Sequence, residues 1–317
     1  MTNDSIHNFQ QTTSHILMIR PVRFAFNEQT AESNAFQDAT ATEDPETIQS
    51  KALREFDMMV DNLRGFGIDV TVIEDTPDPH TPDAIFPNNW ISFHQAGSGT
   101  IYLYPMQAHN RRLERRMDII EILKRRFHIS QIVDLSHFES EDKFLEGTGS
   151  LVLDRDYRIA YACLSPRTHE ELLKEFAQKM DYRVVSFHAT DEHNKPIYHT
   201  NVIMCIGEQF AVICLECIQD EKERYHVRKT LEETNKEIIE LSIEQVNRFA
   251  GNMLQLRSRK GERLLVMSTQ AYQALLPDQL RRLEKYTQIT YTNLNTIERN
   301  GGGSARCMIA EVHLSPL

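Results

Sequence analysis

The sequence predicts an α/β fold in which five similar units form one ring. First, the order strand, tight turn, strand, amphipathic helix, strand recurs along the 317 residues. Second, no linker rich in Pro, Gly or Ser divides the chain, although its length allows one to three domains. Third, one unit is too short to bury a core easily, whereas a ring whose terminal strands pair leaves no free edge. An open α/β sheet with an irregular strand order is the alternative.

The first complete unit covers residues 90–135. Two apolar runs, Trp90–Phe93 and Ile101–Tyr104, flank a glycine-rich turn at 95–100 and predict a hairpin. A helix is expected at 113–127, because four of its apolar residues are spaced by three, three and four: Met117, Ile120, Leu123 and Phe127. The strand Ile132–Leu135 completes the unit.

Three further units repeat this order. Their predicted strand pairs are Leu151–Leu153 with Ile159–Cys163, Val202–Ile206 with Phe210–Leu215, and Met253–Leu256 with Leu264–Met267. Helices are expected at 169–180, 220–235 and 270–285. The third strands are Arg183–Phe187, Ile238–Leu241 and Ile289–Tyr291.

The fifth unit is split between the two ends of the sequence. Met308–Leu314 and Ile16–Val22 supply its paired strands, and Val70–Ile73 supplies the third. Pro45–Arg64 is the expected helix, because Asp44 is a favourable N-cap residue and proline suits the first helical position. Residues 1–13 are polar and are expected to form a flexible tail, which leaves 14–317 as a single domain.

Charge and cysteine content narrow the class of protein. The net charge of −11 argues against a nucleic-acid partner, and no apolar run approaches the length of a membrane span. The N-terminus lacks the basic start and apolar core of a signal peptide, and five cysteines make no disulfide scaffold. We therefore expect a cytoplasmic protein with reduced thiols, and its oligomeric state stays open. A zinc site at Cys205, Cys214 and Cys217 is a less favoured alternative, because two of these lie in apolar strand segments.

Polar or reactive residues recur near the first strand of each unit. They are Asn88 with Asn89, then Glu146, His199, Asn252 and Cys307, at intervals of 53 to 57 residues from Asn89 onward. In a ring, equivalent positions of successive units converge on the axis. A cysteine, a histidine and a carboxylate in one cleft indicate nucleophilic catalysis, in which the thiolate attacks and the imidazole moves protons. The glycines 301–303 before Cys307 allow close approach of backbone to a ligand.

Several stretches resemble the guanidine-group-modifying enzymes of the pentein superfamily, which include arginine deiminases, dimethylarginine dimethylaminohydrolases and amidinotransferases. The matching stretches are Pro82–Trp90, Leu145–Gly149, Leu164–Thr168, His199–Asn201 and Gly301–Cys307. Phe24–Thr30 with Phe86–Trp90 is most similar to the branch called citrulline-utilisation hydrolases. The resemblance implies a five-bladed α/β propeller with pseudo-fivefold ββαβ repeats and no cofactor or metal.

The resemblance also implies roles for individual residues. Cys307 would attack the carbon of a guanidino or ureido group, His199 would protonate the leaving nitrogen and then activate water, and Glu146 would bind a substrate nitrogen or orient the site around His199. Arg167 would bind the substrate α-carboxylate, or cap the following helix. Arg111 and Arg112 would form a second carboxylate-binding element. The alternative is that they begin a solvated helix. Asp83 would receive the α-amino group, or is a turn residue.

Two positions depart from the arginine-directed pattern. Arginine-directed members carry a carboxylate where this sequence has Asn89, and deiminases carry another where it has Asn201. A buried guanidinium without paired carboxylates is costly, whereas a neutral ureido group suits an amide that donates and accepts. We therefore predict a citrulline-like substrate and the products ornithine, ammonia and carbon dioxide. Arginine or dimethylarginine hydrolysis, transfer to an amine acceptor, and a non-enzymatic binding module are the alternatives.

Overall fold

The computed structural model describes residues 10–31, 34, 36–37, 43–95 and 99–317. In this part of the chain the strands form five three-stranded sheets, which confirms the predicted five units. The sheets, in spatial order, are β3 (Ile91–His94), β4 (Thr100–Leu103) and β5 (Gln131–Asp134); β6 (Val152–Asp154), β7 (Ile159–Cys163) and β8 (Arg183–Phe187); β9 (Met204–Ile206), β10 (Phe210–Ile213) and β11 (Glu237–Glu240); β12 (Leu254–Arg257), β13 (Arg263–Ser268) and β14 (Gln288–Thr292); and β15 (Ala310–Glu311), β1 (His15–Arg20) and β2 (Asp69–Glu74).

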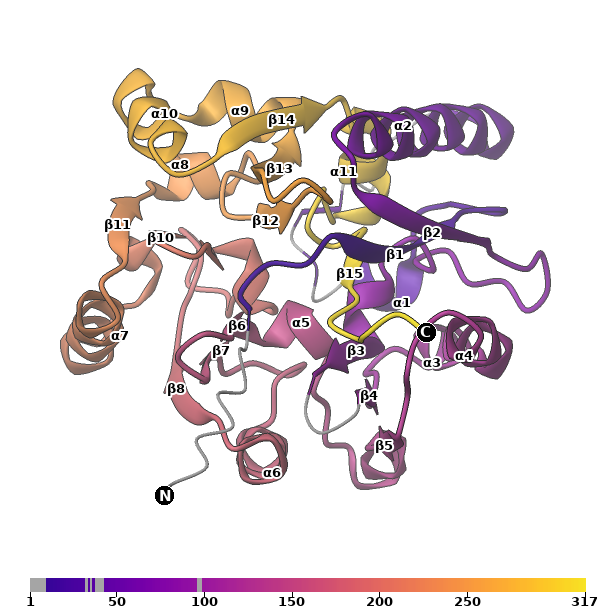
Figure 1. The fold of residues 1–317 in the computed structure, drawn as a ribbon, viewed down its shortest axis with the longest axis horizontal. Helices are drawn as coiled ribbons and strands as arrows, with labels where there is room; N and C mark the ends of the chain where they lie inside the picture. The colour runs from indigo at the N-terminus through magenta and orange to yellow at the C-terminus, as the bar shows by residue number, and fades with distance from the viewer. Residues whose placement is uncertain (1–9, 32–33, 35, 38–42, 96–98) are drawn as a thin grey trace.

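Every sheet has the same connectivity. The middle strand pairs antiparallel with the first strand of its unit and parallel with the third. The middle strands β4, β7 and β10 are buried along their whole length, which explains why they are continuous apolar runs rather than alternating patterns. Figure 1 shows the five sheets around a common centre, with the long helices on the outside.

The helices follow the predicted amphipathic segments, with two interruptions. α2 (Pro45–Gly65) has Asp44 as its N-cap, as expected, and α6 (Glu170–Met180) and α7 (Glu221–Glu233) lie where the spacing placed them. The segment 113–127 contains only α4 (Met117–Lys124), preceded by α3 (His109–Arg112). The segment 270–285 is divided into α9 (Thr269–Ala274) and α10 (Pro277–Glu284), because proline has no N–H to continue a helix and favours extended backbone before it.

Further short helices were not predicted. They are α1 (Glu28–Ala31), α5 (Gly147–Ser150), α8 (Ile243–Val246) and α11 (Asn295–Gly301), with 3₁₀ turns η1 (Pro87–Asn89), η2 (Ser136–Glu141), η3 (Thr200–Val202) and η4 (Leu215–Cys217). α5 lies at the centre of the sheets in Figure 1 and contacts η1 and η3. A Cβ on Gly147 would lie 2.2 Å from the carbonyl oxygen of Asn88, so this approach requires glycine.

The two ends of the chain meet in one sheet. β15 pairs antiparallel with β1, where Ile16 faces Glu311 and Leu17 faces Ala310, as the closed ring requires. The prediction of a flexible tail over 1–13 is wrong for its last residues. Residues 1–9 lie outside the described residues, but Gln11 is buried and its side chain donates to the carbonyls of Leu153 and Ile206. Thr13 is buried as well: its carbonyl accepts from the N–H of Arg257 in another unit, and its hydroxyl donates to the carbonyl of Val312. Within the described ranges, no helix is long and apolar enough to cross a membrane.

Candidate active site

Residues from separate units converge beside α5. A small cavity is lined by Asn34, Asp83, Phe86, Asn89, Arg111, Arg167, Tyr198, His199, the glycines 301–303 and Cys307. The predicted residues Asn201 and Glu146 contact members of this set directly. The register of polar residues in the repeat therefore predicted a real cluster.

Cys307 sits in a tight turn that follows α11. Gly302 ends this helix with φ of 63°, a left-handed conformation that glycine adopts without strain, and a Cβ there would lie 2.5 Å from the side chain of Asn34. The Cys307 backbone N–H donates to the Ser304 carbonyl at 3.0 Å. Two side-chain amides donate to its sulfur, Asn252 at 3.2 Å and Asn201 at 3.5 Å. Such donors favour the thiolate, which is the nucleophilic form.

His199 and Glu146 form a buried pair. The Nε2 atom of His199 lies 2.8 Å from Oε2 of Glu146, and the backbone N–H of Gln107 donates to the other carboxylate oxygen at 3.0 Å. Arg167 approaches the same carboxylate at 3.5 Å. A Cβ on Gly149 would lie 2.8 Å from Nδ1 of His199, so this glycine makes room for the imidazole.

Burial and charge set the protonation of this pair. Burial opposes the charged carboxylate, but Arg167 and His199 outweigh it and lower the pKa of Glu146 to about 2. Burial lowers the pKa of His199 to about 4, although Glu146 acts against this. At neutral pH the pair is therefore a carboxylate and a neutral imidazole. Because Nε2 donates to Glu146, Nδ1 is the nitrogen left for proton transfer.

Arg167 lies at the wall of the cavity. Its guanidinium stacks over the ring of Tyr198 at 4.7 Å, and its Nη2 atom donates to the carbonyl of Thr30 at 3.4 Å. Arg167 is not the capping residue of the following helix, because His169 is the N-cap of α6. The alternative reading of Arg167 as a cap is therefore wrong.

Arg111 and Arg112 point to different places. Arg111 is buried and lines the cavity, where it binds both carboxylate oxygens of Glu114 at 2.8 and 3.0 Å and the Oδ1 atom of Asn89 at 2.8 Å. Glu114 and nearby Asp83 hold the pKa of Arg111 above its usual range despite its burial. Arg112 instead donates to the carbonyls of Met106 and Gln107 and does not line this cavity. The expectation that Arg112 contributes to a substrate-binding element has no support in this geometry.

Asp83 and Asn88 are both buried, but only Asp83 lines the cavity. The Oδ2 atom of Asp83 accepts from Asn27 at 2.7 Å and Thr30 at 3.4 Å, while its Oδ1 atom has no hydrogen-bond partner among the described residues. Burial raises the pKa of Asp83, although Arg111 opposes this effect. The Asn88 side chain makes no hydrogen bond to a described residue, and its backbone carbonyl faces Gly147 and Thr148.

The sequence itself identifies the family. The profile of one family, described as N,N dimethylarginine dimethylhydrolase, eukaryotic, matches residues 20–314. The chain belongs to the N,N-dimethylarginine dimethylhydrolase family. Its members are cysteine-dependent hydrolases of the pentein superfamily, which confirms the resemblance and the predicted class of enzyme. No curated protein matches this sequence.

Solved structures show that this family member shares its fold with arginine-modifying hydrolases. ArgZ, an arginine dihydrolase from the ornithine–ammonia cycle in cyanobacteria, matches 96% of the chain at 17% identity and a TM-score of 0.74, and the chain spans 41% of its length. The substrate-bound N-terminal domain of ArgZ matches 96% of this chain at 17% identity and a TM-score of 0.73. The match covers 99% of that domain. A dimethylarginine dimethylaminohydrolase variant, captured as an adduct with S-methyl-L-thiocitrulline, has a TM-score of 0.64 at 15% identity over 96% of this chain and 99% of its own.

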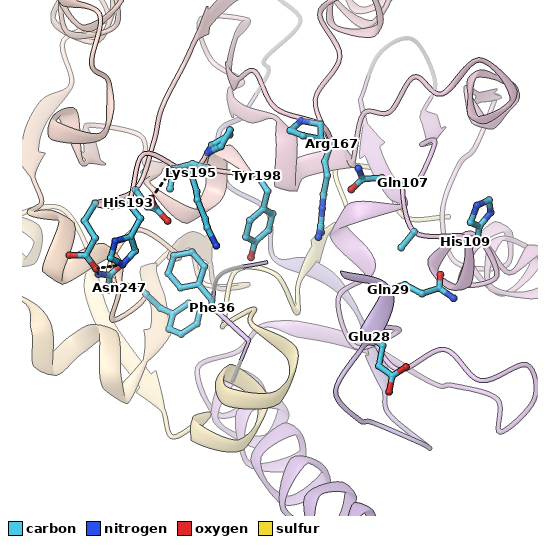
Figure 2. Close-up of a pocket in the computed structure, with 17 residues that line it drawn as sticks. Glu28, Gln29, Phe36, Gln107, His109, Arg167, His193, Lys195, Tyr198 and Asn247 are labelled. Atoms are coloured by element: carbon cyan, nitrogen blue, oxygen red, sulfur yellow. Dashed lines mark hydrogen bonds and ion pairs between the residues drawn. The ribbon is translucent and has the colours of Figure 1, made fainter. Parts of the chain in front are cut away.

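A larger pocket adjoins the cavity of this family member. Its volume is about 1060 Å³, and Arg167 and Tyr198 line both spaces. Figure 2 shows these two side chains between the loop that carries His193 and Lys195 and the segment that carries Gln29. A ligand in the larger pocket would therefore contact Arg167, which also lines the cavity beside Cys307.

Sequence reasoning missed two parts of the site and gave a third no role. Asn252 was recognised only by its register, and no pattern indicated that Glu114 would hold Arg111 or that Asn27 would hold Asp83. The zinc alternative is not supported, because no group of three metal-ligating side chains occurs in the described ranges. Cys214 and Cys217 lie with their sulfurs 3.3 Å apart, and both are buried.

Proposed function

We propose that the chain hydrolyses a carbon–nitrogen bond of a ureido amino acid, with citrulline as the substrate. The sulfur of Cys307 attacks the ureido carbon, and His199 receives the thiol proton and delivers it to the terminal nitrogen, which leaves as ammonia. The resulting S-carbamoyl group is then attacked by water, which His199 deprotonates, and the sulfur leaves. The carbamate released breaks down to ornithine and carbon dioxide. Glu146 keeps His199 oriented through both steps.

The orientation of the Asn89 amide supports this substrate most directly. Arg111 has only donors, so the contact of 2.8 Å fixes the Oδ1 atom of Asn89 toward the guanidinium. The Nδ2 atom of Asn89, which carries the donor hydrogens, has no hydrogen-bond partner among the described residues. It lies beside Gly149 and near His199, where it can donate to a bound group. A ureido carbonyl is an acceptor, whereas a guanidinium offers none.

Asn201 complements Asn89. Its Nδ2 atom donates to the sulfur of Cys307, and its Oδ1 atom is buried without a partner in the described part of the chain. Together the two amides offer one donor and one acceptor beside the nucleophile. A ureido group carries both a carbonyl and N–H groups, so it matches this pair.

We assign the amino-acid end of the substrate to Arg167 and Asp83. Arg167 faces the larger pocket and can pair bidentately with an α-carboxylate, while the unpartnered Oδ1 atom of Asp83 can accept from an α-ammonium group. Arg111 takes part through Asn89 rather than by binding a carboxylate. We further propose that the five sheets around α5 are the blades of a five-bladed α/β propeller, with this site on its axis.

Arginine is the second candidate substrate. The carboxylate of Glu146 lies in the site, and the ArgZ and dimethylarginine dimethylaminohydrolase structures are those of enzymes named for guanidino substrates. Transfer to an amine would require that water be kept from the covalent intermediate. A purely binding role does not explain why Cys307, His199 and Glu146 come together.

Steady-state assays with citrulline, arginine and dimethylarginine test the proposal. We expect release of ornithine and ammonia from citrulline, a higher kcat/KM for citrulline than for arginine, and no activity in Cys307→Ala. Mass spectrometry of the enzyme mixed with substrate should show an adduct on the peptide that contains Cys307. A clear preference for arginine would refute the assignment of citrulline. An increase of product on adding an amine acceptor would favour transfer.

A further inference from the structure

We infer that Asn252 is a catalytic residue that stabilises the thiolate of Cys307, both before attack and when the sulfur leaves. This inference rests on the proposed cysteine chemistry. Its evidence is the geometry of a buried amide that contacts the nucleophile directly.

The backbone brings Asn252 to the sulfur through a close approach that only glycine permits. Asn252 lies between Gly251 and β12, and a Cβ on Gly251 would lie 2.2 Å from the carbonyl oxygen of Val202. This packing presses the segment against η3, which carries Asn201. The Asn252 side chain is consequently almost fully buried, with 1% of its surface exposed, and its Nδ2 atom lies 3.2 Å from Sγ of Cys307.

Both polar atoms of the Asn252 side chain make hydrogen bonds. Its Oδ1 atom accepts from the backbone N–H of Arg306 at 3.0 Å, and a backbone N–H can only donate, so the orientation of the amide is fixed. One Nδ2 hydrogen is directed to the carbonyl of Asn201 at 3.1 Å, which leaves the other for the sulfur. Asn252 can therefore donate to Cys307 but cannot accept its thiol proton.

Asn201 differs from Asn252 in this respect. The Oδ1 atom of Asn201 has no partner among the described residues, so this amide is available to a substrate as well as to the sulfur. The imidazole of His199 is neutral at rest and supplies no positive charge to the thiolate. The fixed hydrogen bond from Asn252 is thus a constant stabilisation of negative charge on Sγ, and hydrogen bonds to a charged atom are stronger than neutral ones.

The thiolate forms twice in the proposed reaction. It attacks the ureido carbon in the first step, and it is the leaving group when water displaces it in the second. Among the described residues, the hydrogen bonds of the Asn252 side chain go to Sγ of Cys307, the Asn201 carbonyl and the Arg306 N–H, and Asn252 does not line the cavity. Its loss should therefore lower the rate of both steps and leave substrate affinity nearly unchanged. This separates its role from that of residues that bind the substrate.

The test is the pH dependence of alkylation of Cys307 by iodoacetamide, followed by mass spectrometry of its peptide. Asn252→Ser keeps an oxygen that can accept from the Arg306 N–H but is too short to reach the sulfur, and Asn252→Asp replaces the donor with an acceptor. We expect the midpoint of alkylation to rise by about one pH unit or more, further in Asn252→Asp than in Asn252→Ser. We expect kcat to fall by about 10- to 100-fold, with KM nearly unchanged.

The charged and titratable groups around the cavity remain unchanged in all variants; they are Asp83, Arg111, Arg167, Tyr198, His199 and Glu146. The shift in Asn252→Ser therefore reports the loss of the amide donor, whereas the shift in Asn252→Asp also includes the added carboxylate. Asn300→Ala is the matched control. Asn300 is also buried and lies close to Cys307 in the sequence, but its amide donates to the carbonyl of Thr296 rather than to the sulfur. Midpoints equal to the wild type in folded Asn252 variants, or an equal shift in the control, would overturn the inference. If Asn252→Asp does not fold, Asn252→Ser decides. The alkylation assay contains no substrate, so it stands even if neither citrulline nor arginine is hydrolysed.

Discussion

Arg111 fixes the orientation of the Asn89 amide, and this makes Asn89 the residue to change in a test of the proposed substrate preference. In Asn89→Asp, the carboxylate can pair with Arg111 through one oxygen and with a guanidinium through the other. The donor to the ureido carbonyl is lost. We expect kcat/KM for citrulline to fall by about 10²-fold and the ratio of arginine to citrulline turnover to rise.

Two measurements accompany this substitution. Thermal unfolding of Asn89→Asp shows whether the fold is retained, and alkylation of Cys307 shows whether the nucleophile is intact. Asn34→Asp is the comparison, because Asn34 lines the same cavity but binds the Gly301 carbonyl and the Phe36 N–H rather than Arg111. An unchanged ratio of the two substrates in a folded Asn89→Asp enzyme would show that this position does not determine preference.

The spacing of the repeat predicted which residues would meet, but it did not predict what each would do. Cys307, His199, Glu146 and Asn89 lie at equivalent positions of successive units, so period alone brings them together. The function of Arg111 depends on Glu114, three residues away on a buried segment, and nothing in the sequence separates this pair from an exposed ion pair of the same spacing.

At the scale of elements, the position of Cys307 depends on how α2 holds α11. The carboxylate of Glu55, on the buried face of α2, accepts from the backbone N–H groups of Thr296 at 2.9 Å and Ile297 at 3.0 Å. These are N–H groups at the start of α11, which have no partner within the helix. α11 in turn leads into the glycines 301–303 and Cys307, so the contact anchors the segment that carries Cys307 to a long outer helix.

Removing this carboxylate should destabilise the protein. In Glu55→Ala, two backbone N–H groups lose their acceptor in a mostly buried place, which costs about 1–3 kcal/mol of unfolding free energy. Urea denaturation measures the loss. Asp61→Ala, at an exposed position of the same helix, is the control and should change stability by less than about 0.5 kcal/mol. Equal stability of the Glu55 variant and the wild type would show that α11 is held by its apolar contacts alone.

Elements with a long periodic pattern were predictable, and short central ones were not. α2, α6 and α7 bury one face, so their apolar spacing is visible in the sequence. α5 has only four residues, including two glycines, and it forms because the surrounding units enclose it. Pro277 was present in the predicted helix 270–285, and its effect on that helix follows from its missing N–H.

At the scale of the whole molecule, residues near the N-terminus connect units that are distant in sequence. Gln11 donates to carbonyls of β6 and β9, and its Oε1 atom accepts from the N–H of Arg155 at 2.7 Å. A polar sequence with no periodicity predicted a tail, because nothing local showed that these side chains would satisfy backbone groups inside the ring. The order of the five units, by contrast, was readable because each repeats the same local pattern.

Buried histidines make the molecule sensitive to acid. Burial lowers the pKa of His199 and the pKa of His313 to about 4, and it lowers the pKa of His94 well below its usual value. The positive charge of Arg155 lowers the pKa of His94 and of His313 further. In the unfolded chain these histidines titrate near pH 6.5. Between about pH 6.5 and 4 the unfolded state therefore binds more protons than the folded state, so stability decreases as pH falls, by up to about 1.4 kcal/mol per pH unit for each histidine.

Urea denaturation at pH 7, 6 and 5 tests this expectation. Glu146 contributes in a lower window, because its pKa of about 2 lies below the usual value of a glutamate and its stabilisation is lost only as pH falls from about 4.5 toward 2. His313→Gln keeps a side-chain donor for Glu311 but does not titrate, so it should lose less stability on acidification than the wild type. His193→Gln changes an exposed histidine and should leave the slope unaltered. A flat dependence from pH 7 to 5 in the wild type, or one equally steep in His313→Gln, would contradict the assignment of the acid sensitivity to these buried imidazoles.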